Sequence, residues 1–156
     1  MLSRDFEKIN MNVNIGSTSQ DTMLEILHLI YQYSWGYDSN DMALLGSVFS
    51  EQASTGGVVQ GTDIGWGSWI GRDNIVKELS AIRNSQSDRR RHVITSTLFK
   101  ELTERHATVR VYLSLFAYCN VEKPHLVTTG NYIMKASMHD GVWLIDLLDE
   151  VLESPF

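Results

Sequence analysis

The first predicted helix carries side chains suited to proton chemistry at its C-terminal end. From Asp21 onward, apolar residues recur at three- and four-residue steps, which predicts an amphipathic helix. One stripe of this helix ends with the phenols of Tyr33 and Tyr37, and the neighbouring stripe ends with the carboxylate of Asp38. A phenol can polarise a carbonyl or a leaving hydroxyl group, and a carboxylate can orient an imidazole that exchanges protons near neutral pH. Such chemistry needs neither a metal nor an organic cofactor, and we expect none.

The remaining histidines and the cysteine do not suggest a second chemistry. No metal-ligand spacing links Cys119 to the histidines His28, His106, His125 and His139. Nothing around Cys119 in the sequence indicates a thiolate nucleophile. A single cysteine also excludes an intrachain disulfide, so nothing in the sequence requires an oxidising compartment.

Helices at the start and strands at the end must position these groups. The segment Ser39-Asn40-Asp41 can cap a second short helix that reaches Phe49, and a third helix is predicted over residues 73–84. Period-two alternation then predicts four strands, over residues 92–100, 105–119, 125–138 and 142–151. Turn residues separate the last three strands, which favours an antiparallel meander. Helices followed by one curved sheet are typical of the α+β class.

A glycine-rich segment separates the second and third helices. Six glycines lie between Thr55 and Gly71, interleaved with Trp66 and Trp69. We predict a loop here, with at most one irregular strand. The glycine spacing does not fit the patterns that bind phosphate between a strand and a helix.

Composition sets limits on the partners of the chain. Its 156 residues have 43% hydrophobic and 21% charged content, which indicates one globular domain, over 21–156, after a flexible lead-in over 1–20. The net charge of −6 disfavours nucleic acid and anionic membranes as partners. No apolar run suggests a signal peptide or a membrane span, so we expect a cytoplasmic protein.

The chain resembles the SnoaL-like proteins of the nuclear-transport-factor-two-like superfamily over roughly residues 20–152. The segments that carry the resemblance are YDSNDM at 37–42, GWGSWIGRDNI at 65–75, RRHVITSTLF at 90–99, VRVYLSLFAY at 109–118, TGNY at 129–132 and DGVWLI at 140–145. The resemblance implies an α+β cone, in which a curved sheet wraps around the long first helix and encloses an apolar pocket. Members include scytalone dehydratase, bile-acid dehydratase and polyketide cyclases, and other members are small dioxygenase subunits.

The resemblance also implies roles for particular residues. Asp38 stands where the dehydratases of this family have an aspartate, and His92 matches a histidine that opens a strand. We expect His92 to be the base, Asp38 its orienting partner or the acid, and Tyr33 or Tyr37 a hydrogen-bond donor. Other dehydratase residues have no counterpart: Tyr118 replaces a second histidine. The site is therefore reduced, and the implied activity is that of a cofactor-independent lyase or isomerase acting on an apolar polyketide or terpenoid intermediate.

The sheet and the glycine-rich segment are expected to supply the substrate-binding wall. On the strand over 105–119, one alternating face is aromatic with a few polar groups, which is typical of a ligand-facing wall. The residues expected to contact substrate are Trp66, Trp69, Tyr112, Ser114, Phe116, Tyr118, Tyr132 and Asp146. The same aromatic face could instead pair two copies of the chain, because this family often forms dimers or trimers.

Simpler explanations exist for each candidate residue. Asp38 could end the first helix and cap the second, and His92 could be a histidine at the edge of the sheet. Tyr33 and Tyr37 could be core residues. The whole protein could also be a non-catalytic ligand-binding module or a small structural subunit of a ring-hydroxylating dioxygenase.

Overall fold

The computed structural model describes residues 14–15, 20–119 and 122–156, which form three helices and a seven-stranded sheet. The elements in chain order are β1 (Asn14–Ile15), α1 (Gln20–Ser39), α2 (Met42–Ser47), β2 (Phe49–Val59), β3 (Gly65–Ile70), α3 (Arg72–Ser85), β4 (Arg89–Leu102), β5 (His106–Tyr118), β6 (His125–His139) and β7 (Val142–Leu152). The predicted lead-in lies outside the described residues, except that β1 pairs with the end of β4 and that α1 begins at Gln20. Among the described residues, none of the helices combines the length and hydropathy that crossing a bilayer would need.

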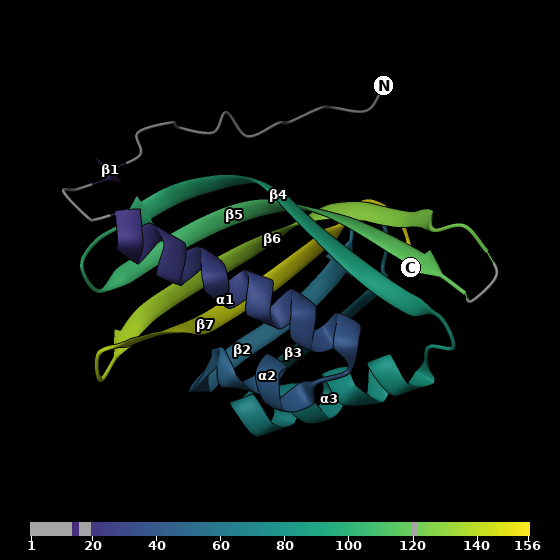
Figure 1. Cartoon of the computed structure of the whole chain (residues 1–156), viewed down its shortest axis with the longest axis horizontal. Helices are drawn as coiled ribbons and strands as arrows, with labels where there is room; N and C mark the ends of the chain where they lie inside the picture. Colours follow the sequence, from purple (N-terminus) through teal and green to yellow (C-terminus); the bar gives the residue numbers. More distant parts are fainter. Residues whose placement is uncertain (1–13, 16–19, 120–121) are drawn as a thin grey trace.

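The sheet is curved and α1 lies across its concave face (Figure 1). The strand order is β1-β4-β5-β6-β7-β2-β3, and the predicted meander from β4 to β7 is confirmed. The sheet is mixed rather than purely antiparallel, because β2 runs parallel to β7 and β1 runs parallel to β4. The α+β class and the cone predicted from the sequence are therefore confirmed, and the parallel pairing adds β2 and β3 to the far side of the meander.

Helix α1 attaches to the sheet through one of its two predicted stripes. The side chains of Ile26 and Ile30 are fully buried, and each contributes about 1.5–3 kcal/mol by leaving water. Near the C-terminal end, α2 packs so closely that a Cβ on Gly36 would lie 2.6 Å from the backbone nitrogen of Leu45. The side chain of Asp41 caps α2 by accepting a hydrogen bond from the Leu44 nitrogen at 2.9 Å. This packing sets the position of the last turn of α1.

The glycine-rich segment is mostly strand, which corrects the predicted loop. Residues Phe49–Val59 and Gly65–Ile70 form the hairpin β2–β3. The glycines suit a close approach, because a Cβ on Gly57 would overlap the Trp66 ring. The Trp66 ring therefore lies directly against the β2 backbone, and a larger residue at position 57 would displace it.

The two faces of β5 have different surroundings. Alternate residues from Ala107 to Ala117 are buried against the helices and form part of the core. The aromatic face is the outer one, and Tyr112 there is 62% exposed. The structure thus corrects the expectation that this face lines a substrate cavity: Tyr112, Ser114, Phe116 and Tyr118 point away from α1.

A β-bulge in β7 shifts the in–out alternation of its side chains by one residue halfway along the strand. Lys135 pairs with Leu147 and Ala136 pairs with Ile145, so Asp146 is the extra residue. Ile145 is buried before the bulge and Leu148 is buried after it. Asp146 therefore does not share a face with Leu148, although simple alternation predicts that it does.

Candidate active site

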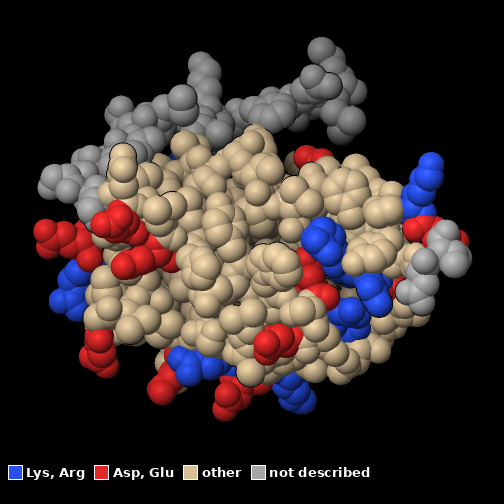
Figure 2. All heavy atoms as spheres, in the orientation of Figure 1, with Lys and Arg blue, Asp and Glu red and all other residues tan. Residues whose placement is uncertain are grey.

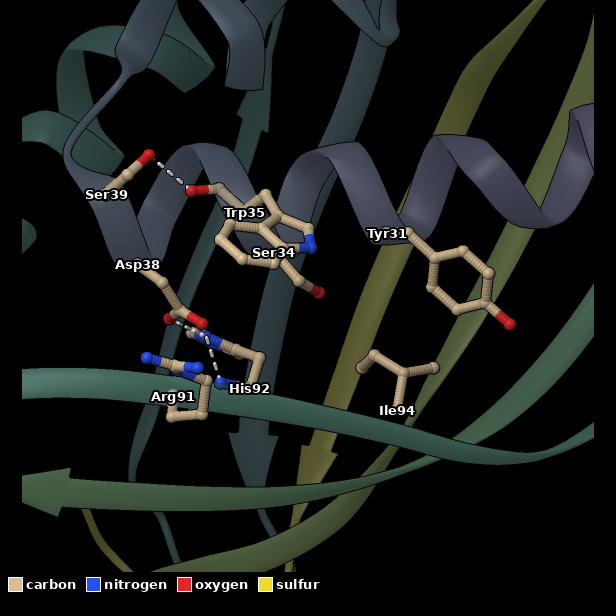
Figure 3. Close-up of a pocket in the computed structure, with 8 residues that line it drawn as sticks. All are labelled: Tyr31, Ser34, Trp35, Asp38, Ser39, Arg91, His92 and Ile94. Carbon is tan, nitrogen blue, oxygen red and sulfur yellow. Dashed lines mark hydrogen bonds and ion pairs between the residues drawn. The ribbon is translucent and has the colours of Figure 1, made fainter. Parts of the chain in front are cut away.

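Asp38 and His92 form a direct pair between the last turn of α1 and β4 (Figure 3). The His92 Nδ1 atom lies 2.6 Å from Asp38 Oδ1, and the backbone N–H of His92 donates to Asp38 Oδ2 at 2.9 Å. The side chains are largely buried, with 6% of His92 and 11% of Asp38 exposed. An ionised carboxylate only accepts hydrogen bonds, so Nδ1 carries the proton and Nε2 is the nitrogen left to exchange a proton with a ligand.

The local fold explains why the two residues meet. His92 lies on the inward-facing set of β4 residues, between the exposed neighbours Arg91 and Val93. Asp38 lies in α1 and does not cap α2, because Asp41 does so. Its carboxylate holds both the backbone and the ring of His92, which fixes the orientation of the imidazole. The arrangement is that of an oriented histidine base.

Three buried tyrosines surround the inner side of His92. The ring centroids of Tyr37 and Tyr33 lie 5.2 Å and 6.5 Å from that of His92, and Tyr132 lies 5.8 Å from Tyr33. Burial raises the pKa of Tyr37 to about 12, and its hydroxyl donates to Gln86 Oε1 at 3.1 Å. Burial also raises the pKa values of Tyr33 and Tyr132. These phenols are therefore protonated near neutral pH and can act as hydrogen-bond donors.

Glu150 is a further acidic group at this site, and it was not among the residues expected there from the sequence. The β7 bulge turns Glu150 inward, where its carboxyl group pairs with the Tyr132 hydroxyl. Burial raises the pKa of Glu150, and the nearby His92 and the Tyr132 hydroxyl offset this only in part. The sequence does contain a signal for this position. Glu150 lies two residues from Leu148 and two from Leu152, and both leucines are buried, so strand alternation places Glu150 on their inward face.

Two cavities meet at His92. The inner cavity, of about 30 Å³, lies inside the cone and is lined by Tyr33, Tyr37, Tyr132 and Glu150 among others. It holds about two water molecules at most. Trp66 and Phe156 cover it, with ring centroids 5.2 Å apart.

The second cavity is a groove of about 270 Å³ between α1 and β4 (Figure 3). Tyr31, Trp35 and Ile94 form its apolar walls, and Asp38 and Arg91 lie at one end. His92 is the residue of the pair that borders both cavities, whereas Asp38 borders only the groove. Because the two ring nitrogens of an imidazole point in different directions, Nε2 points away from Asp38.

A buried arginine also lines the inner cavity. Arg90 is 9% exposed, and its Nε donates to Asp88 Oδ1 at 2.7 Å. Its Nη1 is buried with no hydrogen-bond partner among the described residues. The inner cavity thus combines a histidine, a carboxyl group, phenols and a guanidinium. The groove also has a carboxylate, a guanidinium and a phenol, from Asp38, Arg91 and Tyr31.

Other residues expected at the site lie elsewhere. Asp146 accepts hydrogen bonds from Ser137 Oγ at 2.5 Å and from His139 Nε2 at 2.9 Å. Partial burial raises the pKa of Asp146, but hydrogen bonds from Ser137, Ser50 and His139 outweigh it and bring the pKa below its usual value. Trp69 packs against the core without lining the inner cavity, while Trp66 and Tyr132 do line it.

The arrangement can remove a proton at one point of a small molecule and deliver another nearby. The oriented imidazole can accept a proton through Nε2. Burial raises the pKa of Glu150, so this carboxyl group takes up a proton at a higher pH than an exposed glutamate does. The phenols can bind an oxygen atom of the reacting molecule.

Several solved structures share this fold. A protein of unknown function with a cystatin-like fold from Nostoc punctiforme has a TM-score of 0.73 at 17% identity, covering 86% of this chain and 92% of its own. A candidate scytalone dehydratase from Novosphingobium aromaticivorans has a TM-score of 0.67 at 20% identity, covering 85% and 84%. The beta subunit of a candidate aromatic-ring-hydroxylating dioxygenase from the same organism has a TM-score of 0.72 at 10% identity, covering 88% and 92%. These similarities establish the fold alone.

The sequence itself identifies the family. No curated protein matches the chain significantly. The model of the SnoaL-like domain matches residues 19–149, which include all of α1, β4 and β5 and most of β7. The chain therefore belongs to the SnoaL-like domain family.

Proposed function

We propose that this protein is a cofactor-independent lyase or isomerase, of the dehydratase, cyclase or epoxide-opening type, that acts on an apolar small molecule. The observation that carries the proposal is the 2.6 Å contact between Asp38 and His92 beside a cavity lined by phenols and a carboxyl group. Membership of the SnoaL-like family and the fold shared with a candidate scytalone dehydratase support the same class. By that resemblance, the substrate is a polyketide or terpenoid intermediate of natural-product biosynthesis.

In the proposed reaction, His92 is the base and Asp38 holds it in place. For a dehydration, Nε2 takes the proton from carbon, the C–O bond breaks, and a protonated side chain gives its proton to the departing hydroxide to form water. Tyr33 or Tyr37 donates a hydrogen bond to the substrate, and Glu150, which lines the same cavity, is the candidate for the acid. Substrate entry requires Trp66 and Phe156 to move, because the inner cavity of about 30 Å³ is too small for such a molecule.

Deuterium exchange tests this proposal with simple compounds in place of the natural substrate. The protein is incubated in D₂O with a panel of β-hydroxyketones and cyclic ketones, and NMR measures the loss of C–H signals next to the carbonyl group. We expect exchange with the native protein and a loss of about 10²- to 10⁴-fold in His92→Ala. His125→Ala is the matched control, because His125 is exposed on β6. Equal exchange in native protein and His92→Ala, or none with any compound, would contradict the proposal.

A non-catalytic role is the second candidate. The fold shared with a dioxygenase beta subunit favours a small structural subunit, in which the buried Asp38–His92 pair would only hold α1 against β4. Purification separates the two roles: a subunit is expected to co-purify with a larger oxygenase component from its native host, and an enzyme is expected to purify alone. A ligand-binding module without catalysis would bind compounds of the panel without exchange.

The proposed setting is a cytoplasmic homo-oligomer, either a dimer or a trimer. Exposed apolar side chains on the outer side of the sheet, including Val93, Tyr112 and Leu126, support pairing of copies through that surface. The net charge of −6 is consistent with a small-molecule substrate rather than nucleic acid.

A further inference from the structure

The edge of the sheet along β4 is open over most of its length. One side of β4 pairs with β5, and on the other side the only pairing among the described residues is that of β1 with the end of β4. The backbone N–H of His92 points to this open side, where it donates to Asp38 on α1. The N–H groups of an antiparallel strand alternate in direction, so the N–H of Ile94 points the same way.

The open edge carries no charge. Neither residues 93–99 of β4 nor residues 26–37 of α1 include an Asp, Glu, Lys or Arg. Figure 2 shows a mainly uncharged surface over the middle of α1 and the adjoining part of β4. Native proteins protect the edges of sheets with charges, prolines, bulges or a covering segment. Residues 93–99 include no proline either, so only the bulges of β4 protect this edge unless a further segment covers it.

The groove between α1 and β4 follows this edge (Figure 3). Its aromatic walls are exposed, with 64% of Trp35 and 39% of Tyr31 accessible to solvent. Tyr31 and Ile94 lie at one end of the groove, and Asp38 and Arg91 lie at the other. The apolar end is therefore the one nearer to β1, because β1 pairs with the C-terminal end of β4.

The sequence that leads into β1 has the pattern of a strand with one apolar face. Residues 9–15 read INMNVNI, in which apolar residues alternate strictly with asparagines. The register of β1 assigns the two faces: Ile15 pairs with Leu102, which is buried, and Asn14 pairs with Glu101, which is exposed. Paired residues of neighbouring strands share a face of the sheet. The apolar positions of a longer β1 would therefore belong to the inner face, toward α1.

The length of this segment matches the distance to the groove. Because β4 is bulged twice between Thr95 and Glu101, β5 covers the same stretch in only four steps. Four steps back from Asn14, the partner of Glu101, position 10 would be level with Thr95. Position 9 would then be level with Ile94, at the apolar end of the groove.

We infer that residues 9–13 continue β1 as a strand parallel to β4, with their apolar side chains packed toward α1 at the end of the groove. Residues 9–13 lie outside the described part of the chain, whereas β1, the edge of β4 and the groove lie within it. The apolar end of the groove is then a surface for this segment rather than a ligand site. Docking of the strand does not depend on whether His92 is a catalytic base.

Amide hydrogen exchange, followed by NMR, tests the docking of this strand. The Ile94 amide should exchange slowly in the native protein, and Met11→Asp, which places a charge on the apolar face, should speed its exchange about tenfold or more. Asn12→Asp is the matched control, because it adds the same charge one position along, on the asparagine face. The Val93 amide faces β5 and should stay protected in both variants.

Fast exchange of the Ile94 amide in the native protein, or equal exchange in the two variants, would overturn the docking of this strand. A second readout uses a nitroxide attached to Asn12→Cys, with Cys119→Ser removing the exposed native thiol. The nitroxide should broaden the NMR signals of Ile94 and Trp35 within its own molecule. No broadening, or broadening that arises only between labelled and unlabelled copies in a mixture, would contradict docking within one chain.

Discussion

Replacing Asp38 by asparagine should reverse the proton position on His92. The carboxylate of Asp38 now accepts two hydrogen bonds, from the backbone N–H and from Nδ1–H of His92. An asparagine side chain has one accepting oxygen and one donating amide group. If its oxygen keeps the backbone N–H, its amide faces Nδ1, which can then only accept. The proton moves to Nε2, and Nε2 can no longer act as a base.

The expected cost follows from the loss of the carboxylate charge, because two charge-assisted hydrogen bonds become neutral ones. Hydrogen bonds to charged groups contribute about 1.5–3 kcal/mol, and both partners are largely buried, so Asp38→Asn should lower the free energy of unfolding by about that amount. Turnover should fall by a larger factor, about 10⁴, if the wrong tautomer removes the base. Urea unfolding measures the first effect, and ¹⁵N NMR of labelled histidine measures the tautomer directly.

The result that would refute this reasoning is a tautomer that does not change. If Asp38→Asn keeps the proton on Nδ1, then the carboxylate does not set the state of His92. Asp63→Asn serves as the control, because Asp63 is exposed in the turn between β2 and β3. The control should alter neither the unfolding free energy nor the His92 signals.

Three further predictions concern the cavity and the outer face. Burial raises the pKa of Glu150, so the free energy of unfolding should fall as pH rises from about 4.5 through that pKa. The fall should be at most about 1.4 kcal/mol per pH unit. Urea unfolding at several pH values should show this slope in the native protein and not in Glu150→Gln. Gly57→Ala should displace the Trp66 ring and cost about 1–3 kcal/mol, as tryptophan fluorescence and urea unfolding would report. Tyr112→Glu should dissociate a homo-oligomer that pairs through the outer sheet face, which light scattering after size exclusion would detect.

The predicted fall in stability with rising pH follows from the linkage between proton binding and folding. Glu150 keeps its proton to a higher pH in the folded state than in the unfolded chain, so raising the pH through that range favours unfolding. An equal pH slope in Glu150→Gln would contradict it. Gly61→Ala is not a suitable control for Gly57, because its φ of 74° is itself unfavourable for alanine. Gln60→Glu controls for Tyr112→Glu, because it adds the same charge at an exposed position on another part of the surface.

Local patterns were sufficient to predict most elements, and the family resemblance supplied the main pair of the site. The period of α1 and the alternation of β4 to β7 follow from which side chains must be buried, so both can be read from residue types. The resemblance placed Asp38 and His92 together although 54 positions separate them, and the structure brings them into contact. The catalytic role of the pair remains a prediction, tested by the experiments above.

Features that depend on contacts between different helices and strands were decided only by the tertiary structure. Alternation shows that β5 has an aromatic and an aliphatic face, but not which face α1 covers, and the aliphatic face is the buried one. The bulge at Asp146 depends on pairing with Lys135 and Ala136, and it turns Glu150 rather than Asp146 toward the cavity. From residue types alone the glycines of β2 predict a loop. The structure shows instead that Gly57 leaves room for the Trp66 ring against the strand. In each case the deciding contact is made with another helix or strand, so residue types predict that a surface is buried without identifying its partner.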